Sequence, residues 1–577
     1  MTYFLQNSDA VLTAARGLAL AHPGLIEVHG DPLFLRSRVA RPGRSVALVS
    51  GGGSGHEPLH TGLLGPGGLD AVCPGEIFAS PHNRQIYAAG RSVARPGGVL
   101  FVVKNYTGDV INFQIAAERL RHDGIPVATV LVDDDLATDK EDTATGRRGT
   151  AATVVLEKLL GAAADEGAGL AELAALGERI VARSRSLAVA ARAQTSPATA
   201  RPAFELSPGT LEYGVGIHGE RGTGTIDHRP VDALVRRLTD DLLDALPPGP
   251  DKVLVVVNGL GATTGLELHA IGAQVHDLLL ARGIEPLAVV PGTFTAALDM
   301  AGFSLTLTRM EPEWTALWTA PSDTPLVLPA RTLTAETATA GTVVTSGAAT
   351  PRAPRGGSPV SGRPVLDRFA ALVLATRDNL TALDQLVGDG DFGDNLLGGV
   401  RRAVNLADSG TDGMAALSGA FLNDVGGTSG PLFGLLFQEL ATVTWPDERA
   451  PEPGKAGSAA DAARTAIHRV GGAEPGDCTL IDALAPAASA LNAPDTAQDN
   501  APFTTAAEAA VQGARATAGL TPRRGRASYV GDRALGVPDP GALGVALLFM
   551  ALAQVYEPDS AGRLPDAREL TAQGGAQ

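Results

Sequence analysis

The sequence Val46-Ala47-Leu48-Val49-Ser50 runs into Gly51-Gly52-Gly53-Ser54-Gly55-His56-Glu57-Pro58. A short apolar run of this kind predicts a buried strand, and the glycines predict a loop that a ligand can approach closely. The loop lacks the Gly-Lys-Ser/Thr ending of a Walker motif and does not match Gly-x-Gly-x-x-Gly. A generic phosphate loop or a simple tight turn stays an alternative. The stretch favours an α/β fold with a small-molecule site.

The same pattern, an apolar run followed by a polar or glycine-containing loop, recurs across the first 330 residues. It is seen at 99–103, 127–132, 253–257 and 287–290. Helical stretches between such runs predict parallel-rich sheets covered on both faces. In these sheets the loops at the carboxyl ends of the strands form the ligand site. We therefore expect an α/β substrate domain over residues 1–330, with two subdomains divided near 185–205.

The composition changes after residue 330. Residues 331–362 are rich in Thr, Ala, Gly, Pro and Ser and contain no aromatic residue, which predicts a flexible linker. From 363 to 577 the strand pattern gives way to eight helical segments, which begin near Val365, Leu396, Met414, Pro431, Ser458, Thr479, Thr504 and Gly541. This half is predicted to be an all-α domain whose loops carry its chemistry.

The composition also excludes several classes of protein. The 577 residues are 44% hydrophobic and 19% charged, so the chain is expected to be globular. The formal net charge of −17 argues against a nucleic-acid binder. The chain has two cysteines that lie far apart, which argues against a disulfide framework. The N-terminus does not resemble a signal peptide. No apolar run reaches the length of about 20 residues that a membrane span needs. A cytoplasmic protein without membrane partners is expected.

Four polar side chains stand out in the first domain because of their places on the predicted loops. His56 ends the glycine loop, and Lys104 and Asp109 follow the next strand, where ligands of α/β sheets bind. His218 lies in Gly214-Val215-Gly216-Ile217-His218-Gly219-Glu220, whose glycines leave its ring open to attack a carbonyl carbon. A lone loop Lys or Asp is more often a solvated charge or a cap, and a lone histidine is more often structural. The combination favours a functional site.

Three carboxylates mark the second domain. Asp384, Asp389 and Asp391 are separated by five and two positions, and Gly388 and Gly390 allow the chain to fold back so that the carboxylates converge. Converging carboxylates repel one another unless a cation neutralises them, and oxygen ligands favour Mg²⁺ or Ca²⁺. An acidic helix-capping loop is the simpler alternative, but the spacing favours a metal site.

Glycine-containing loops before predicted helices recur in this domain. They are Gly426-Gly427-Thr428-Ser429-Gly430, Gly476-Asp477-Cys478-Thr479, Gly525-Arg526-Ala527-Ser528-Tyr529 and Asp539-Pro540-Gly541. Backbone N–H groups at a helix start bind phosphate, and the third loop adds a positive charge. Each loop alone is a weak signal, but together they predict one nucleotide site at the open end of a helix bundle.

Taken together, these motifs resemble the dihydroxyacetone kinase family, and the resemblance spans nearly the whole chain. The stretches 51–58, 104–109 and 216–220 are similar to the family's substrate domain. The stretches 388–391, 426–430 and 525–529 are similar to its nucleotide domain. The resemblance implies an α/β substrate domain joined to an eight-helix barrel, and an ATP- and Mg²⁺-dependent kinase for dihydroxyacetone.

The resemblance also implies roles for the substrate residues. His218 would add to the ketone through a ring nitrogen and form a covalent hemiaminal, and Asp109 would take the proton from the terminal hydroxyl. His56 would hydrogen-bond the substrate and assist acid–base chemistry, with Lys104 orienting the substrate. The implied substrate-binding set is Gly53, Ser54, Gly55, His56, Lys104, Asp109 and His218.

For the nucleotide domain, the resemblance implies that Asp384, Asp389 and Asp391 hold Mg²⁺ on the ATP phosphates. The implied nucleotide contacts are Phe392, Gly393, Asp394, Asn395, Thr428, Ser429, Gly476, Arg526, Asp539, Pro540 and Gly541. Phe392 and Cys478 stand where the family often has histidine and arginine or lysine, which bears on nucleotide affinity. Family members form homodimers through the substrate domain, and the helical domain of one chain can serve the partner's substrate.

Three alternatives stay open. The substrate can be a related carbonyl sugar such as glyceraldehyde or erythrulose. The helical domain can instead act as an FAD-AMP lyase that makes a cyclic phosphate. Relatives also work as phosphocarrier-coupled or regulatory proteins, but those arrangements use separate chains, so the fusion of both domains disfavours them.

Overall fold

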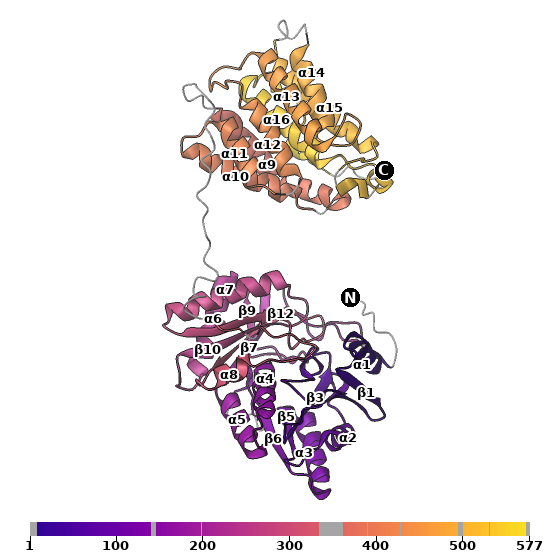
Figure 1. Cartoon of the computed structure of the whole chain (residues 1–577). Coiled ribbons are helices and arrows are strands. Elements are labelled where there is room, and N and C mark those ends of the chain that lie inside the picture. Colours follow the sequence, from indigo (N-terminus) through magenta and orange to yellow (C-terminus); the bar gives the residue numbers. More distant parts are fainter. Residues whose placement is uncertain are drawn as a thin grey trace. The chain divides into compact units, whose positions relative to one another are not determined.

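The computed structural model describes residues 9–139, 146–197, 199–329, 331–333, 362–388, 390–426, 428–493, 500–524, 526–529 and 531–572. The chain divides into two compact units, Met1–Val344 and Thr345–Gln577, each described here by itself (Figure 1). The predicted linker at 331–362 lies mostly outside the described residues. The linker and the predicted domain boundaries therefore stay predictions.

The first sheet of the first unit has the strand order β1-β2-β4-β3-β5-β6. Its strands are β1 (Ile26–Gly30), β2 (Leu33–Ser37), β3 (Ala47–Ser54), β4 (Ala71–Ile77), β5 (Val99–Lys104) and β6 (Val127–Val132). The last four are parallel, and β1 and β2 form an antiparallel hairpin at one edge. Both faces are covered, one by α2 (Asn83–Val93) and α3 (Thr107–His122), the other by α4 (Ala152–Asp165) and α5 (Leu170–Ala182).

The second sheet has the order β11-β10-β12-β7-β8-β9. Its strands are β7 (Ser184–Arg192), β8 (Thr210–Tyr213), β9 (Gly224–Asp227), β10 (Lys252–Gly259), β11 (Glu285–Gly292) and β12 (Ala301–Arg309). Only β10 and β11 pair in parallel, so the prediction of a parallel-rich sheet is wrong here. An apolar run indicates burial but not strand direction. Helices α6 (Val231–Ala245) and α7 (Gly265–Ala281) pack on this sheet.

Helix α4 holds the two sheets together (Figure 1). It contacts β5 of the first sheet and β7 and β12 of the second, and its residues from Ala152 to Ala164 are buried. Two further helices complete this core, α1 (Ala10–Ala21) and α8 (Trp314–Thr319). A helix buried on all sides can present polar side chains only to a site or to a buried partner. Glu157 and Lys158 of α4 are such side chains.

The second unit is all helical. Its long helices are α9 (Arg363–Val387), α10 (Phe392–Asp408), α11 (Gly413–Asn423), α12 (Ser429–Leu440), α13 (Pro453–Gly471), α14 (Ile481–Asn492), α15 (Pro502–Ala516) and α16 (Pro540–Tyr556). Each helix packs against the next along the chain, and α16 returns to α9, which closes a ring. The predicted α/β plus eight-helix fold class is thus confirmed. A short α17 (Ala567–Thr571) was not predicted from the sequence.

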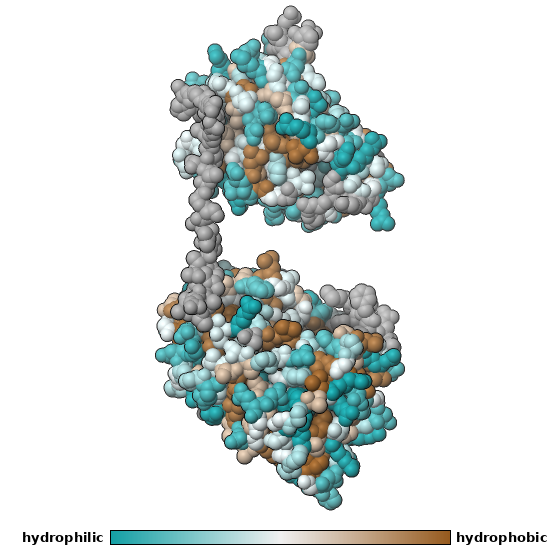
Figure 2. All heavy atoms as spheres, in the orientation of Figure 1, coloured by the Kyte–Doolittle hydropathy of each residue, from teal (hydrophilic) through white to brown (hydrophobic). Residues whose placement is uncertain are grey.

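Short 3₁₀ helices connect several of these elements: η1 (Thr61–Leu63), η2 (Leu136–Thr138), η4 (Thr517–Gly519), η5 (Arg526–Tyr529), η6 (Gly531–Ala534) and η7 (Ala561–Arg563). Figure 2 shows apolar residues in scattered patches among polar ones on the visible face of each unit. Within the described residues, no helix combines the length and apolar character needed to cross a membrane.

Candidate active site

The loops after β3 and β5 lie side by side because these strands are parallel neighbours. The glycines predicted to form a loop belong to β3, which runs on through Gly51, Gly52 and Gly53 to Ser54 and then leads into His56. β5 ends at Lys104, with Asp109 in the first turn of α3. His218 comes from the second sheet, in the loop between β8 and β9. Its ring centroid lies 4.7 Å from that of His56. Predicted residues from both sheets therefore meet at one site.

His56 is fixed by the loop between β11 and β12. Its Nδ1 lies 2.8 Å from the carbonyl oxygen of Ala296, which can only accept, so Nδ1 carries the proton. The backbone carbonyl of His56 in turn accepts from the N–H of Ala296. Burial, Lys104 and His218 lower the pKa of His56 well below its usual value. His56 is thus neutral near pH 7 and presents Nε2 as a proton acceptor.

Glu220 orients the His218 ring. Nδ1 of His218 lies 3.1 Å from a carboxylate oxygen of Glu220, whose other oxygen accepts from the His218 backbone N–H. Burial alone would raise the pKa of Glu220, but the hydrogen bond to His218 and the charges of His218 and Arg148 lower it to about 2. An ionised Glu220 keeps the proton on Nδ1 of His218. Nε2 then carries the lone pair that a nucleophile needs.

Unpartnered polar atoms surround these histidines. Nε2 of His56, Nζ of Lys104 and Oδ1 of Asp109 are buried and have no hydrogen-bond partner among the described residues. The pKa of Lys104 is lowered overall, because burial outweighs the opposing effect of the charges of Asp109 and Glu157. Buried polar groups are nearly always hydrogen-bonded in folded proteins. Several orphaned donors and acceptors in one place therefore indicate a polar ligand.

The glycine-rich end of β3 and Gly55 are shaped by Phe78, which lies just after β4. The Phe78 ring stacks on His56 at 5.1 Å and meets His218 edge-on at 5.4 Å. A methyl group at Gly53 would lie 2.9 Å from the backbone nitrogen of Ala79, and one at Gly55 would lie 2.8 Å from the Phe78 ring. Gly55 also has a φ of +101°, which favours glycine.

Tyr106, Ser54 and an open hollow surround the site formed by His56 and His218. The Tyr106 ring lies 4.6 Å from that of His218, and Ser54 donates a 2.7 Å hydrogen bond to the carbonyl of Gly75. Ser54, predicted to bind substrate, thus ties β3 to β4. An open hollow of about 490 Å³ adjoins the loop and is lined by Gly55, Glu57, Gly261, Ala262, Ala296, Leu298 and Asp299. Solvent can reach the neighbourhood of the site through this hollow.

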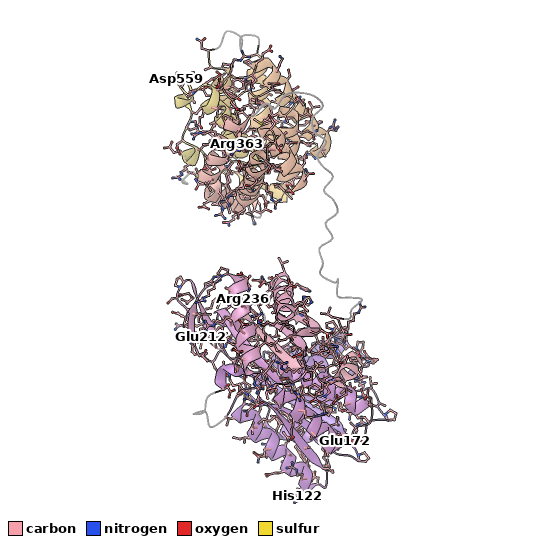
Figure 3. The ribbon with its side chains drawn as sticks, turned by 90° about the vertical axis from the view of Figure 1, so that its left-hand side faces the viewer. His122, Glu172, Glu212, Arg236, Arg363 and Asp559 are labelled. Atoms are coloured by element: carbon pink, nitrogen blue, oxygen red, sulfur yellow. The ribbon has the colours of Figure 1, made fainter. Side chains whose placement is uncertain are left out.

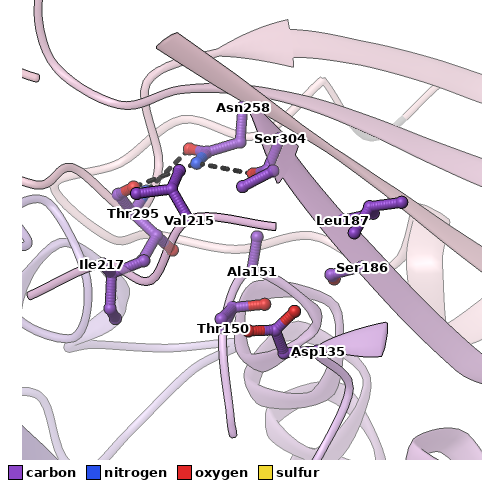
Figure 4. A pocket seen from close by; sticks show the side chains of 11 residues that line it. Asp135, Thr150, Ala151, Ser186, Leu187, Val215, Ile217, Asn258, Thr295 and Ser304 are labelled. Atoms are coloured by element: carbon purple, nitrogen blue, oxygen red, sulfur yellow. Dashed lines mark hydrogen bonds between the residues drawn. The ribbon is translucent and has the colours of Figure 1, made fainter. Parts of the chain in front are cut away.

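Asn258 at the end of β10 was missed by sequence reasoning, although it follows an apolar run. Its Oδ1 accepts from the N–H groups of Phe294 and Thr295, both at 2.8 Å, and its Nδ2 donates to Thr295 and Ser304 (Figure 4). It lines a cavity of about 10 Å³, room for about one water molecule. Asn258 therefore pins the loop whose Ala296 carbonyl holds His56.

We expect Asn258→Ala to lower kcat/KM about tenfold and the free energy of unfolding by about 1–3 kcal/mol, because two buried backbone N–H groups lose their acceptor. Steady-state kinetics and urea unfolding would measure both. Ser304→Ala is the matched control, since it removes one contact of Asn258 and leaves the loop bonds intact. A loss of stability with unchanged kcat/KM would contradict a positioning role for this loop.

The helical unit has a hollow of about 210 Å³ at the ends of its helices. Of the residues predicted for metal or nucleotide, those that line it are Asp384, Asp391, Phe392, Thr428, Asp539, Pro540 and Gly541. The lining also includes Ile467, Cys478, Thr479, Leu480 and Arg524, which the predicted site set did not contain. The hollow thus combines carboxylates at one part of its wall with apolar side chains at another.

Other predicted residues are not part of the lining, and those that the structure describes make structural contacts. Gly393 packs so closely against α9 that a methyl group would lie 2.4 Å from the Arg377 carbonyl. Asp394 is exposed and pairs with Arg377 at 2.7 Å. Gly476 donates its N–H to Asp482, and Asn395 donates its own to the carbonyl of Asp391. Asp389 and the side chains of Ser429 and Arg526 lie outside what the structure describes.

Two carboxylates of the hollow, Asp384 and Asp539, lie in different surroundings. Burial raises the pKa of Asp539 to about 7, with the charges of Asp482 and Asp384 adding to the rise. Asp384 accepts the backbone N–H groups of Asp391 and Phe392 with one oxygen, which fixes the carboxylate at the start of α10. Among the described residues, no group of three or more His, Cys, Asp or Glu side chains could hold a metal ion. Asp389, the third predicted ligand, lies outside the described residues.

Comparison with known proteins follows the same division of the chain. Residues 16–326 match the Dak1 domain, and residues 386–554 match the DAK2 domain. The fold matches a crystal structure of the dihydroxyacetone kinase of C. freundii with a TM-score of 0.60 and 30% identity, over 96% of this chain and all of that one. The chain belongs to the dihydroxyacetone kinase family.

Relatives within the dihydroxyacetone kinase family carry different names. The chain is 36% identical to an L-erythrulose 1-kinase of Mycolicibacterium smegmatis, over 96% of this chain and 99% of that protein. It is 35% identical to a triokinase/FMN cyclase of Rattus norvegicus, over 95% and 97%. A second crystal structure of the C. freundii kinase, in complex with AMP-PNP and Mg²⁺, matches with a TM-score of 0.58 and 30% identity, over 96% and 99%.

Proposed function

We propose that this protein transfers the γ-phosphoryl group of ATP to a short ketose, with dihydroxyacetone as its substrate. The observation that carries the proposal is the set of unpartnered buried atoms on His56, Lys104 and Asp109 beside the His218 ring. The kinase names of relatives that span the whole chain support it, as does a homologous structure holding AMP-PNP and Mg²⁺.

The first step is capture of the carbonyl by His218. Its Nε2 lone pair forms a bond to the carbonyl carbon, the π pair moves to oxygen, and that oxygen takes a proton. The Nδ1 proton leaves along the hydrogen bond to Glu220 and passes to solvent, and the new alkoxide takes its proton from solvent, so one proton is lost and one is gained. A polyol such as glycerol has no carbonyl to capture and is excluded. Phe78 and Tyr106 wall the ring, which limits the bound sugar to a short chain.

The second step is attack of the terminal hydroxyl on the γ-phosphate. Asp109 takes the hydroxyl proton, as a general base held in the first turn of α3. Lys104 and His56 orient the sugar through their unpartnered nitrogens. We propose that Asp384, Asp389 and Asp391 hold Mg²⁺, which supplies charge neutralisation on the ATP phosphates.

The proposal is tested by measuring ADP release with ATP, Mg²⁺ and dihydroxyacetone, L-erythrulose, D-erythrulose or glyceraldehyde. We expect ketose-dependent turnover and none with glycerol. Absence of turnover with every one of these sugars would reject the kinase. The panel also ranks three-carbon against four-carbon substrates, which matters because relatives are named for both.

We expect Asp384→Asn to weaken Mg²⁺-dependent ATP binding at least about tenfold, because ligand carboxylates dominate the affinity of an oxygen site. The asparagine oxygen can still accept from Asp391 and Phe392, so the loop keeps its cap. Calorimetric titration with and without Mg²⁺ gives the affinity.

Asp378→Asn is the matched control for this change, since Asp378 lies on the same helix with its side chain 85% exposed. Equal ATP affinity for Asp384→Asn and wild type would remove this carboxylate from the metal site.

A second candidate function is cyclisation of FAD by the helical unit. It is favoured by the similarity to proteins named triokinase/FMN cyclase. Release of a cyclic phosphate from FAD with Mn²⁺ and no ketose would establish it.

We also propose that the protein forms a homodimer, which a measurement of its molar mass in solution would test. A further proposal is that the helical unit of one chain serves the substrate bound by its partner.

A further inference from the structure

The phosphoryl transfer described above leaves one buried pair unused. His60 lies on the loop after β3 and is 3% exposed, and Glu157 lies on α4 and is fully buried. Nδ1 of His60 is 2.6 Å from Oε1 of Glu157 and 2.9 Å from the hydroxyl of Ser50. That hydroxyl donates to the carbonyl of Val102, so toward His60 it acts as an acceptor. Both neighbours of Nδ1 therefore accept a proton from it.

This arrangement decides the chemistry of the other ring nitrogen. With the proton on Nδ1, Nε2 of His60 carries a lone pair and accepts hydrogen bonds. Nε2 is buried and has no partner among the described residues. The ring thus presents an unsatisfied acceptor, oriented from behind by Glu157.

The unsatisfied acceptor lies beside an unsatisfied donor. A methyl group at Gly52 would be 3.3 Å from Nε2 of His60 and 2.9 Å from Nζ of Lys104, so both nitrogens face the same glycine. Lys104 is fully buried, and its ammonium group also lacks a partner among the described residues. An ammonium group only donates, and this imidazole nitrogen only accepts. A hydroxyl group, which accepts one hydrogen bond and donates another, matches the pair.

We propose that His60 and Lys104 form a subsite for one hydroxyl group of the substrate, with Glu157 as a positioning residue. The inference rests on the proposed function, since it concerns the sugar that His218 captures. The hydroxyl accepts from Nζ of Lys104 and donates to Nε2 of His60. A water molecule has the same hydrogen-bonding chemistry, so the experiment must separate the two.

The test uses acetone, hydroxyacetone and dihydroxyacetone, which share a ketone and add one hydroxyl at a time. Their apparent affinities are measured without ATP, by the adduct fraction in intact-protein mass spectrometry over a concentration series. For the full-length wild type we expect affinity to rise with each hydroxyl. Each added hydroxyl thus gives one step in affinity. In His60→Leu one of these two gains in affinity should shrink by about ten- to a hundredfold, the value of a hydrogen bond to a charged or polarised partner. The acetone affinity should not change.

Glu157→Gln is the second variant, because it keeps the volume of the side chain. The amide can donate to Nδ1 of His60, which moves the ring proton to Nε2 and turns the acceptor into a donor facing Lys104. The same step should shrink. Glu166→Gln, an exposed residue just past the end of α4, carries the same charge change and should leave the series unaltered.

Each outcome separates the hypotheses. If His60→Leu weakens all three ketones equally, a water molecule or a structural contact occupies the pair and the subsite is rejected. If both hydroxyl steps persist in both variants, it is also rejected. If wild-type protein forms no adduct with any ketone, the proposed capture by His218 fails and takes this inference with it, whereas the kinase function is tested separately by ADP release.

Discussion

Replacing His218 by glutamine is expected to lower kcat for dihydroxyacetone phosphorylation by at least about a thousandfold, because the covalent capture of the ketone is lost. The ring is held by Glu220 through Nδ1, so Nε2 is the reacting atom. Glutamine is similar in length and can still hydrogen-bond Glu220, but its amide is not a nucleophile. The loss should appear together with the disappearance of the ketose adduct.

Steady-state kinetics and intact-protein mass spectrometry measure these two effects on one preparation. His122→Gln is the control, since His122 is the exposed last residue of α3, at one tip of the first unit (Figure 3). Retention of phosphorylation without an adduct would mean that the ketone is bound non-covalently, and it would overturn the role of His218.

Asp109→Asn is expected to lower kcat by about 10²–10⁴-fold, the range for loss of a general base. The carboxylate is 3% exposed, and its Oδ1 has no partner among the described residues. The carboxylate lies in the first turn of α3, and its charge acts on the nearby Lys104. Asparagine keeps the shape but cannot take the hydroxyl proton. The His218 adduct should therefore persist while transfer fails.

The adduct fraction and kcat together distinguish a general base from a substrate-binding group at Asp109. Asp123→Asn, at the C-cap of the same helix, is the control, because its exposed carboxylate accepts from the Tyr87 hydroxyl at the other end of α3 from Asp109. A fall in kcat of less than about tenfold would be too small for the loss of a base. Loss of the adduct in Asp109→Asn would instead place this carboxylate in substrate binding.

Much of the substrate site could be predicted because its residues follow apolar strands. Lys104 ends β5 and His56 follows β3, and parallel neighbours bring such positions together at one edge of a sheet. His60 and Glu157 gave no such signal. They lie 97 positions apart and meet only because α4 packs between the two sheets. A polar residue on a helix pattern does not reveal which buried partner it will find.

The helical half shows the same limit. Eight helices could be predicted from their apolar spacing, but not which residues line the hollow at their ends. Phe392 and Gly393 are adjacent in one motif, yet Phe392 lines the hollow while Gly393 packs against α9. Arg524 reaches the lining although only Arg526 stood in the recognised loop. In an α-helix each residue is rotated by about 100° from the one before it, so residues adjacent in sequence point in different directions.

By itself, the amino-acid sequence determined the two-part α/β and all-helical organisation, the family, and the motif residues, because strand and helix periods and glycine loops are local properties of the chain. Only the tertiary structure decided that the second sheet is mainly antiparallel and that Asn258 anchors the His56 loop. It alone also set His60 and Lys104 beside Gly52, with Glu157 hydrogen-bonded to the far side of the His60 ring. Those contacts join segments far apart in the chain, where packing chooses the partners and no local pattern records them.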